Sequence, residues 1–239
     1  MHYPTKLIIG HLIKRYKRFL ADVELEDGTI VTAHCPNSGS MESVKTPGAK
    51  VWLSPAKNKN RKLKFTWELI QVRDTLVGIN TNLSNKIVVE GIENGLIPEL
   101  DGYTILTQEV PYGQNSRIDI LLRSPDKPDC YVEVKNTTLR RQWNKEGLVE
   151  FPDAVTKRGT KHLRELAEMV KHGNRSIMFF LVQREDANRF CIAEDIDPEY
   201  GATFKEAIKC GVEVLCYTCS LTTERIKINS AIDVMLTKK

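Results

Sequence analysis

Two short apolar segments with facing acidic residues constrain the fold of this chain more than any other feature. The segments RIDILLRS and DCYVEVKN contain Asp119 and the run Glu133-Val134-Lys135, and the turn-forming residues SPDKP (124–128) join them. In a hairpin centred on Asp126, Asp119 lies opposite Glu133, because both are seven residues from the centre. Opposed Cβ atoms are about 4.5–5.5 Å apart, and like charges there destabilise a sheet. We therefore predict a hairpin whose carboxylates need a compensating cation.

The cation that suits such a site is a divalent ion with hard oxygen ligands, Mg²⁺ or Mn²⁺. Side chains alternate along a strand, so Lys135 shares the face of Glu133 and can hold or activate a water beside the ion. This arrangement is the one that cleavage of a phosphodiester requires. The alternative is an ordinary solvated hairpin face.

The neighbouring residues argue against a solvated face. Leu121 is expected on the face of Asp119, and Tyr131 on that of Glu133. The other face is predicted to be apolar, with Ile118, Ile120, Leu122, Val132 and Val134. The strands are therefore expected to be covered on both sides.

Length and composition indicate a soluble globular protein of one large or two modest domains, since the chain has 239 residues. No apolar run approaches the roughly 18 residues of a membrane span, so no membrane partner is expected. The charges near the N-terminus follow a short apolar patch, the reverse of a secretory signal, which predicts a cytoplasmic protein. The cysteines are then expected to be free thiols, and Cys216-Tyr-Thr-Cys219 is a lone C-x-x-C.

Positive charge is concentrated in the first third of the chain. Residues 1–80 hold 13 Lys/Arg against 7 Asp/Glu, a balance of +6. Two basic runs cover residues 14–19 and 57–64, and the first includes aromatic residues. Such runs bind phosphates without reading sequence, or are merely solvated loops. The predicted nucleic-acid contacts here are Arg15, Lys17, Arg18, Lys59, Arg61, Lys62 and Lys64.

The chain divides into two regions by pattern. Five short strands are predicted within residues 16–80, at 18–25, 29–36, 50–56, 64–71 and 75–80, with a turn at Asp27-Gly28. Short strands without a helix favour a small closed barrel of the OB type. We predict an OB-like nucleic-acid-binding barrel over residues 1–81 and a second domain over 82–239.

The second domain is predicted to be an α/β (α+β) unit with a mixed sheet. Helices are expected at 83–95, 153–171 and after Asp197, and strands at 104–110, 117–123, 129–135, 176–183, 212–219 and 224–229. Lys157, Lys161 and Arg164 line one face of the helix at 153–171. They are candidates for phosphate contacts, or form a solvated helix face.

Several strings then resemble a known family along essentially the whole chain. RFLADVEL, TAHCPNSGSM, RKLKFTWELI, SRIDILL, YVEVKNTTL and FPDAVTKRGTKHLREL, in that order, are similar to the sugar fermentation stimulation protein A family. The resemblance implies non-specific DNA binding. It also implies an OB-like N-terminal domain and a C-terminal domain like restriction endonucleases of the PD-(D/E)xK type.

The resemblance also assigns roles residue by residue. Asp119, Glu133 and Lys135 match the catalytic motif, and Asp119, Glu133 and Glu90 are the implied metal ligands. Glu90 takes the place of a carboxylate that such nucleases often add from a helix. Ile118 stands where the motif has Pro, and nearby glycines make the Glu90 helix poorer than expected.

Other polar residues have less defined roles. Glu109 either completes the site or pairs with Arg117. His162 either touches a phosphate or leaving group or is structural, and His34 either caps a loop or contacts DNA. The sequence has no H-E-x-x-H, Walker-type or G-x-G-x-x-G motif, which removes the metalloprotease, NTPase and dehydrogenase classes.

Three hypotheses follow. The chain is a metal-dependent DNA nuclease, a catalytically silent DNA-binding regulator of sugar metabolism genes, or a protein that binds or processes RNA. The sequence alone does not separate DNA from RNA, and it shows no self-complementary patch that would indicate an oligomeric state.

Overall fold

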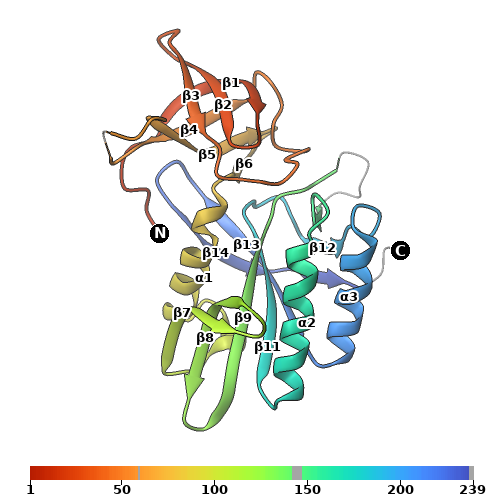
Figure 1. Cartoon of the computed structure of the whole chain (residues 1–239). Helices are drawn as coiled ribbons and strands as arrows, with labels where there is room; N and C mark the ends of the chain where they lie inside the picture. Colours follow the sequence, from red (N-terminus) through yellow and green to blue (C-terminus); the bar gives the residue numbers. More distant parts are fainter. Residues whose placement is uncertain (59, 142–146, 237–239) are drawn as a thin grey trace.

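The computed structural model describes residues 1–58, 60–141 and 147–236. A β-barrel from the N-terminal part of the chain lies on a larger α/β unit (Figure 1). The barrel region contains β1 (Ile8–Tyr16), β2 (Leu20–Leu25), β3 (Ile30–His34), β4 (Lys50–Pro55), β5 (Phe65–Val72) and β6 (Thr75–Gly78).

The barrel closes through strands β1 to β5. They lie in the order β3-β2-β1-β4-β5, and β3 also pairs with β5. Buried residues such as Leu12, Val23 and Trp67 fill the interior. The predicted Asp27-Gly28 turn joins β2 to β3, with Gly28 at φ 81°.

One strand of the predicted barrel was assigned wrongly. Closure uses β1, which was not predicted from the sequence, because its charged residues hide the alternation that begins at Ile8. The segment predicted as the fifth strand instead forms β6, which pairs with the outer edge of β5.

The C-terminal unit is built on a mixed sheet in the order β14-β13-β11-β9-β8-β7. Strands β9, β11 and β13 are parallel, and the other pairs are antiparallel. Its strands are β7 (Ile105–Tyr112), β8 (Ser116–Ser124), β9 (Lys127–Thr137), β11 (Arg175–Val182), β13 (Glu213–Leu221) and β14 (Ile226–Ala231).

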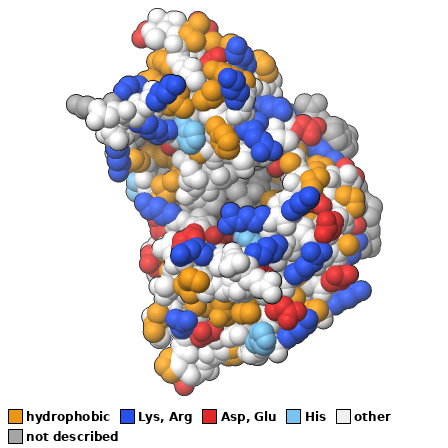
Figure 2. Space-filling model, in the orientation of Figure 1, with side chains coloured by type: hydrophobic (Ala, Val, Ile, Leu, Met, Phe, Trp, Pro, Cys, Tyr) orange, Lys and Arg blue, Asp and Glu red, His pale blue; other side chains and the backbone are white. Residues whose placement is uncertain are grey.

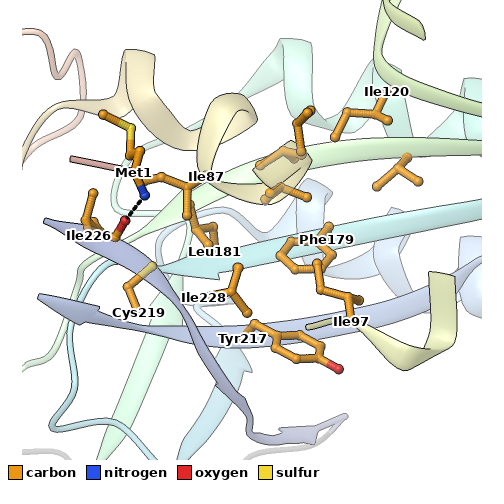
Figure 3. Packing of buried hydrophobic residues seen from close by; sticks show 14 of the residues in the cluster. Met1, Ile87, Ile97, Ile120, Phe179, Leu181, Tyr217, Cys219, Ile226 and Ile228 are labelled. Atoms are coloured by element: carbon orange, nitrogen blue, oxygen red, sulfur yellow. Dashed lines mark hydrogen bonds between the residues drawn. The ribbon is translucent and has the colours of Figure 1, made fainter. Parts of the chain in front are cut away.

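Helices cover both faces of this sheet (Figure 1). On one face lies α1 (Ser84–Glu93), which follows the 3₁₀ turn η1 (Thr81–Leu83) and precedes η2 (Pro98–Leu100). Its Ile87 packs with side chains of β11 and β14, among them Leu181 and Ile228 (Figure 3). The other face is covered by α2 (Lys157–Lys171) and α3 (Pro198–Lys209). Helix α3 follows Asp197 as predicted, and Asp197 caps it by accepting a hydrogen bond from the Tyr200 amide.

A small parallel sheet beside α3 was not predicted. It consists of β10 (Leu148–Phe151), β12 (Arg189–Ile192) and β15 (Asp233–Met235), in that order. These strands have four residues or fewer, too short for a periodic pattern.

The loop after β3 links the barrel to the C-terminal unit. The Met41 amide donates to Asp153 Oδ2 at 3.0 Å, and Ser43 Oγ donates to the Thr138 carbonyl at 3.3 Å. A Cβ at Gly39 would collide with the Asp153 carboxylate. The loop thus requires glycine at this approach. The division into domains at 81/82 stays a prediction.

The cysteines are free thiols in the part of the chain that is described, with Cys210 exposed and the others buried. Cys216 and Cys219 lie in separate hydrophobic clusters. They are three residues apart on β13, and an odd spacing along a strand places two side chains on opposite faces of the sheet. None of the described helices is long and apolar enough to span a membrane.

Candidate nuclease site

Away from its turn, the β8–β9 hairpin has the predicted register, but at the turn Ser124 pairs with Lys127 instead of Pro128. Ile120 pairs with Val132 and Leu122 with Cys130, and Arg123 forms an ion pair with Asp129 at 2.9 Å. Asp119 and Glu133 continue this register by one step, at the end of the paired segment. The predicted alternation of side chains between the two faces of β8 fails at Ile118. This residue packs with Leu121 on the face covered by α2, and not with Ile120 on the other face.

Asp119 is held by groups from two elements. Its Oδ2 accepts a hydrogen bond from the Val134 amide at 2.8 Å, and its Oδ1 accepts one from Asn85 Nδ2 of α1 at 2.9 Å. Burial, followed by the charge of Glu133, raises the pKa of the Asp119 carboxyl. The residue is half-buried, so it lies at the mouth of the site with Glu133 behind it.

Glu133 is almost fully enclosed, with 2 % of its surface exposed. Its Oε1 accepts hydrogen bonds from Lys135 Nζ, at 2.6 Å, and from His162 Nδ1 of α2. Burial acts to raise the pKa of Glu133, but Lys135 and His162 outweigh it and hold the pKa below its usual value. Its Oε2 is buried and has no hydrogen-bond partner among the described residues.

His162 is oriented by Arg158, one turn earlier on α2. Arg158 Nε lies 3.3 Å from His162 Nε2. Because a guanidinium only donates, Nε2 must accept, and Nδ1 then carries the proton that faces Glu133. The basic face of α2 therefore helps to orient Glu133, through Arg158 and His162.

Two tyrosines near Glu133 also have unpaired hydroxyls. Among the described residues, the buried OH groups of Tyr112 and Tyr200 have no hydrogen-bond partner. Burial, and after it the charge of Glu133, raises the pKa of both phenols. Buried polar atoms are normally satisfied, so a bound water or ion would supply the partners that these atoms lack.

Glu90 does not join the carboxylates, which corrects the predicted ligand set. It accepts a hydrogen bond from the α-amino group of Met1 at 2.5 Å, and its side chain is 37 % exposed. Asn85, five residues earlier on α1, faces Asp119 instead. At 3.6 residues per turn, a spacing of five places two side chains on different sides of a helix.

Glu109 lies nearer the site than Glu90 does. In the β7–β8 register it falls opposite Asp119, between the pairs Gln108–Ile120 and Val110–Ile118. Its Oε1 is 3.5 Å from Asn85 Nδ2, and its φ of 55° is left-handed. The predicted pairing with Arg117 is made through the backbone carbonyl of Glu109 rather than its carboxylate.

The predicted phosphate contacts differ in how exposed they are. Lys17 and Arg18 are exposed at the β1–β2 turn, as are Lys62 and Lys64 after β4 and Lys157 at the start of α2. Arg61 is half-buried and donates to Thr66 Oγ1. Lys59 lies outside the described residues.

Three of the predicted contacts are engaged by the protein itself. Arg15 Nη2 donates to the carbonyls of Asn37 and Gly39 at 2.9 Å, so it holds the loop after β3. Lys161 donates to the Gln114 carbonyl at 2.6 Å. Arg164 forms an ion pair with Glu199. That these cations also contact phosphate stays a prediction.

Asn85 and Arg158 were not predicted from the sequence, and the role of His162 was left open. The i, i+4 spacing of Arg158 and His162 was the available signal, because it places both on one helix face. Asn85 had no such signal, since its role depends on where α1 meets β8.

Comparison with known proteins places the chain in a family. A family model described as "Sugar fermentation stimulation protein RE domain" matches residues 82–225, and one described as "SfsA N-terminal OB domain" matches residues 13–79. The chain belongs to the sugar fermentation stimulation protein family. The SfsA homologue of Rhodospirillum rubrum is 54 % identical over 98 % of this chain and 99 % of its own. That of Maricaulis maris is 50 % identical over the full length of both.

A solved SfsA structure has the same fold. SfsA of Pyrococcus furiosus, described as a complex with Ca²⁺, superimposes with a TM-score of 0.87 and 25 % identity over 98 % of each chain. The predicted fold class is therefore confirmed: an SfsA OB barrel followed by a restriction-endonuclease-like unit with a mixed sheet.

Proposed function

We propose that this SfsA protein is a divalent-metal-dependent nuclease that binds DNA without reading its sequence. The observation that carries the proposal is the unpaired Oε2 of Glu133, a buried carboxylate oxygen beside Asp119 and Lys135. Burying a carboxylate oxygen without a partner costs free energy of folding. A hard divalent cation bound to that oxygen would remove this cost, because such cations prefer oxygen ligands.

The residues present fit Mg²⁺ or Mn²⁺. Asp119 and Glu133 would hold the ion, and Glu109, which shares Asn85 with Asp119, is the nearest further acid that we can name. When bound, such an ion polarises a phosphate oxygen and lowers the pKa of a coordinated water. The Pyrococcus SfsA was solved in complex with Ca²⁺, another cation that prefers oxygen ligands.

The surrounding side chains orient the acids and the substrate. The Val134 amide and Asn85 fix Asp119, and His162, set by Arg158, fixes Glu133. Lys135 donates to Glu133, and 16 % of its side chain is exposed at the site. There it can position a water or stabilise charge that develops on the phosphate.

The exposed cations near the barrel support backbone binding. Figure 2 shows a hollow between the barrel and the lower body, with Lys and Arg side chains along its rim. Contacts with phosphates position a protein on DNA but do not read bases. The choice of DNA over RNA follows the usual description of the family.

A silent DNA-binding protein is the second candidate, and one observation favours it. The described residues contain no cluster of three or more His, Cys, Asp or Glu side chains that could hold a metal. Both oxygens of Asp119 and one of Glu133 are also already hydrogen-bonded. An RNA substrate is a further outcome of the experiment below.

The test is incubation of the pure protein with labelled single- and double-stranded DNA and RNA, in Mg²⁺, in Mn²⁺ or in EDTA. We expect cleavage of DNA that needs the metal and is lost in Asp119→Asn and Lys135→Ala. Asp126→Asn, an exposed acid at the hairpin turn, is the matched control and should stay active. Intact DNA in every lane, with salt-sensitive binding retained, would leave the silent alternative.

A metal-binding measurement separates the two candidates further. An ion that binds only the folded state at 100 times its Kd stabilises it by about 2.7 kcal/mol. We expect Mn²⁺ to raise the melting temperature of the parent protein and of Asp126→Asn, but not of Asp119→Asn.

A further inference from the structure

A cavity lies on the barrel, apart from the carboxylates of the β8–β9 hairpin. It has a volume of about 550 Å³, which is within the usual size range of small-molecule sites. Its lining comes from β3, the segment before β5, β5 itself and the chain that leads to α1. None of the roles assigned above to the acids uses this cavity.

The buried part of the lining is a hydrogen-bonding floor. Glu68 and Asn80 are 6 % and 7 % exposed. Glu68 accepts hydrogen bonds from Ser54 Oγ at 2.6 Å and from Asn80 Nδ2 at 2.8 Å. A carboxylate has about four lone-pair sites, so Glu68 retains capacity for a further donor.

The rim of the cavity carries positive charge, and its side chains include planar groups on which a nucleobase can stack. Arg61 and Lys62 line it together with the half-buried His34. Burial, and after it the charge of Arg61, lowers the pKa of His34, which keeps the imidazole neutral near pH 7. Imidazole rings and guanidinium planes are surfaces on which unstacked bases lie, and the cations suit a phosphate.

One residue of the cavity lining lies one helical turn before Asn85, whose side chain contacts Asp119. Asn82, in its lining, belongs to η1, and the backbone stays helical through Leu83 and Ser84 into α1. Residues three apart in such a helix have Cβ atoms about 5–6 Å apart. Asn82 is therefore a neighbour of Asn85, which donates to Asp119.

We propose that the cavity receives one unpaired nucleobase of the strand whose phosphate lies at Asp119 and Glu133. The base lies against His34 and Arg61 and hydrogen-bonds to the floor formed by Glu68 and Asn80. A base in an intact duplex is stacked and must first be extruded, which costs free energy. The preferred substrate is thus DNA with unpaired nucleotides. This inference rests on the proposed function for the position of the strand.

The test uses Asp119→Asn protein in EDTA, where no cleavage occurs, and measures binding by fluorescence anisotropy. Probes are a single-stranded DNA, its duplex, and the same single strand with abasic nucleotides. We expect tighter binding to the single strand than to the duplex, and about tenfold weaker binding when bases are removed. His34→Ala and Asn82→Ala should lose this dependence on bases and leave duplex binding unchanged.

Controls keep the outcomes distinct. Lys17→Asn changes an exposed cation at the β1–β2 turn, which is not part of the cavity lining, and should weaken binding to all probes alike. Equal affinity for intact and abasic strands in the parent, or an equal loss for every probe in His34→Ala, would overturn the inference. Because binding is measured without metal, failure of the cleavage experiment leaves this test unaffected.

A direct readout of the cavity is the ¹H NMR signal of the His34 ring, assigned with His34→Ala. Addition of a deoxynucleoside monophosphate should shift it, whereas inorganic phosphate alone should shift it less. Equal shifts from both would mean that the cavity binds phosphate only and would also overturn the inference.

Discussion

His162 on α2 and Glu133 on β9 form a buried hydrogen bond through Nδ1 and Oε1, with 3 % and 2 % of their side chains exposed. The contact joins the helix that carries the basic face to the strand that carries the motif Glu. The orientation of Glu133 and the packing of α2 on the sheet therefore depend on the same side chain.

Removal of His162 should therefore cost stability as well as activity. In His162→Ala, Glu133 loses one hydrogen-bond donor and Arg158 loses its acceptor. We expect the free energy of unfolding to fall by about 1–3 kcal/mol, as measured by urea denaturation. His172→Ala, an exposed histidine just after α2, is the control and should stay within about 0.5 kcal/mol of the parent. Equal stability of the two variants would contradict the role given to this bond.

Much of the fold could be predicted because its elements are long or strongly marked. The hairpin register followed from the turn residues, and the ion pair between Arg123 and Asp129 agrees with it. Helix α3 was expected after Asp197, which caps it. What failed was short or local in signal. Strand β1 is rich in charge, and the β10-β12-β15 sheet depends on long-range pairing between strands of four residues or fewer.

The site was predictable only where it lies along one hairpin. Asp119, Glu133 and Lys135 share local geometry, so their proximity follows from strand periodicity. Residues from other elements depend on how helices dock. This is why Glu90 was assigned a role that the structure does not support, and why Asn85 was missed.

The loop after β3 should depend on Asp153. In Asp153→Ala the Met41 amide loses its acceptor, and the loop that Arg15 also holds loses its anchor on the C-terminal unit. We expect faster hydrogen exchange at residues 38–43 and a loss of about 1–2 kcal/mol in stability. Asp126→Ala, at an exposed turn, should leave exchange in the loop unchanged. Unaltered protection in Asp153→Ala would show that the loop is held by other contacts.

The β1–β2 turn should contribute to sequence-independent binding of DNA. Lys17 and Arg18 have φ values of 46° and 62°, so asparagine, which tolerates this conformation, is the suitable replacement. We expect Lys17→Asn/Arg18→Asn to weaken DNA binding uniformly across sequences. The slope of log K against log salt should fall by about 1.5, since each phosphate contact contributes about 0.7–0.9. Lys209→Asn, at the end of α3, should change neither quantity. An unchanged slope in the double variant would mean that Lys17 and Arg18 do not contact the DNA phosphates.

Glu68 should make stability depend on pH with a defined sign. Burial, the largest cause, raises its pKa above the ordinary value of 4.5. The folded state then binds the proton more tightly than the unfolded chain does. The resulting stabilisation is complete below the unfolded pKa and is lost as pH rises through the folded pKa. We therefore expect the parent to lose stability relative to Glu68→Gln between about pH 4.5 and neutrality.

The measurement is urea denaturation of both proteins across this range, with the exposed Glu42→Gln as control for the loss of one carboxylate. A parent that instead gains stability relative to Glu68→Gln as pH rises would mean that the bonds from Ser54 and Asn80 outweigh burial.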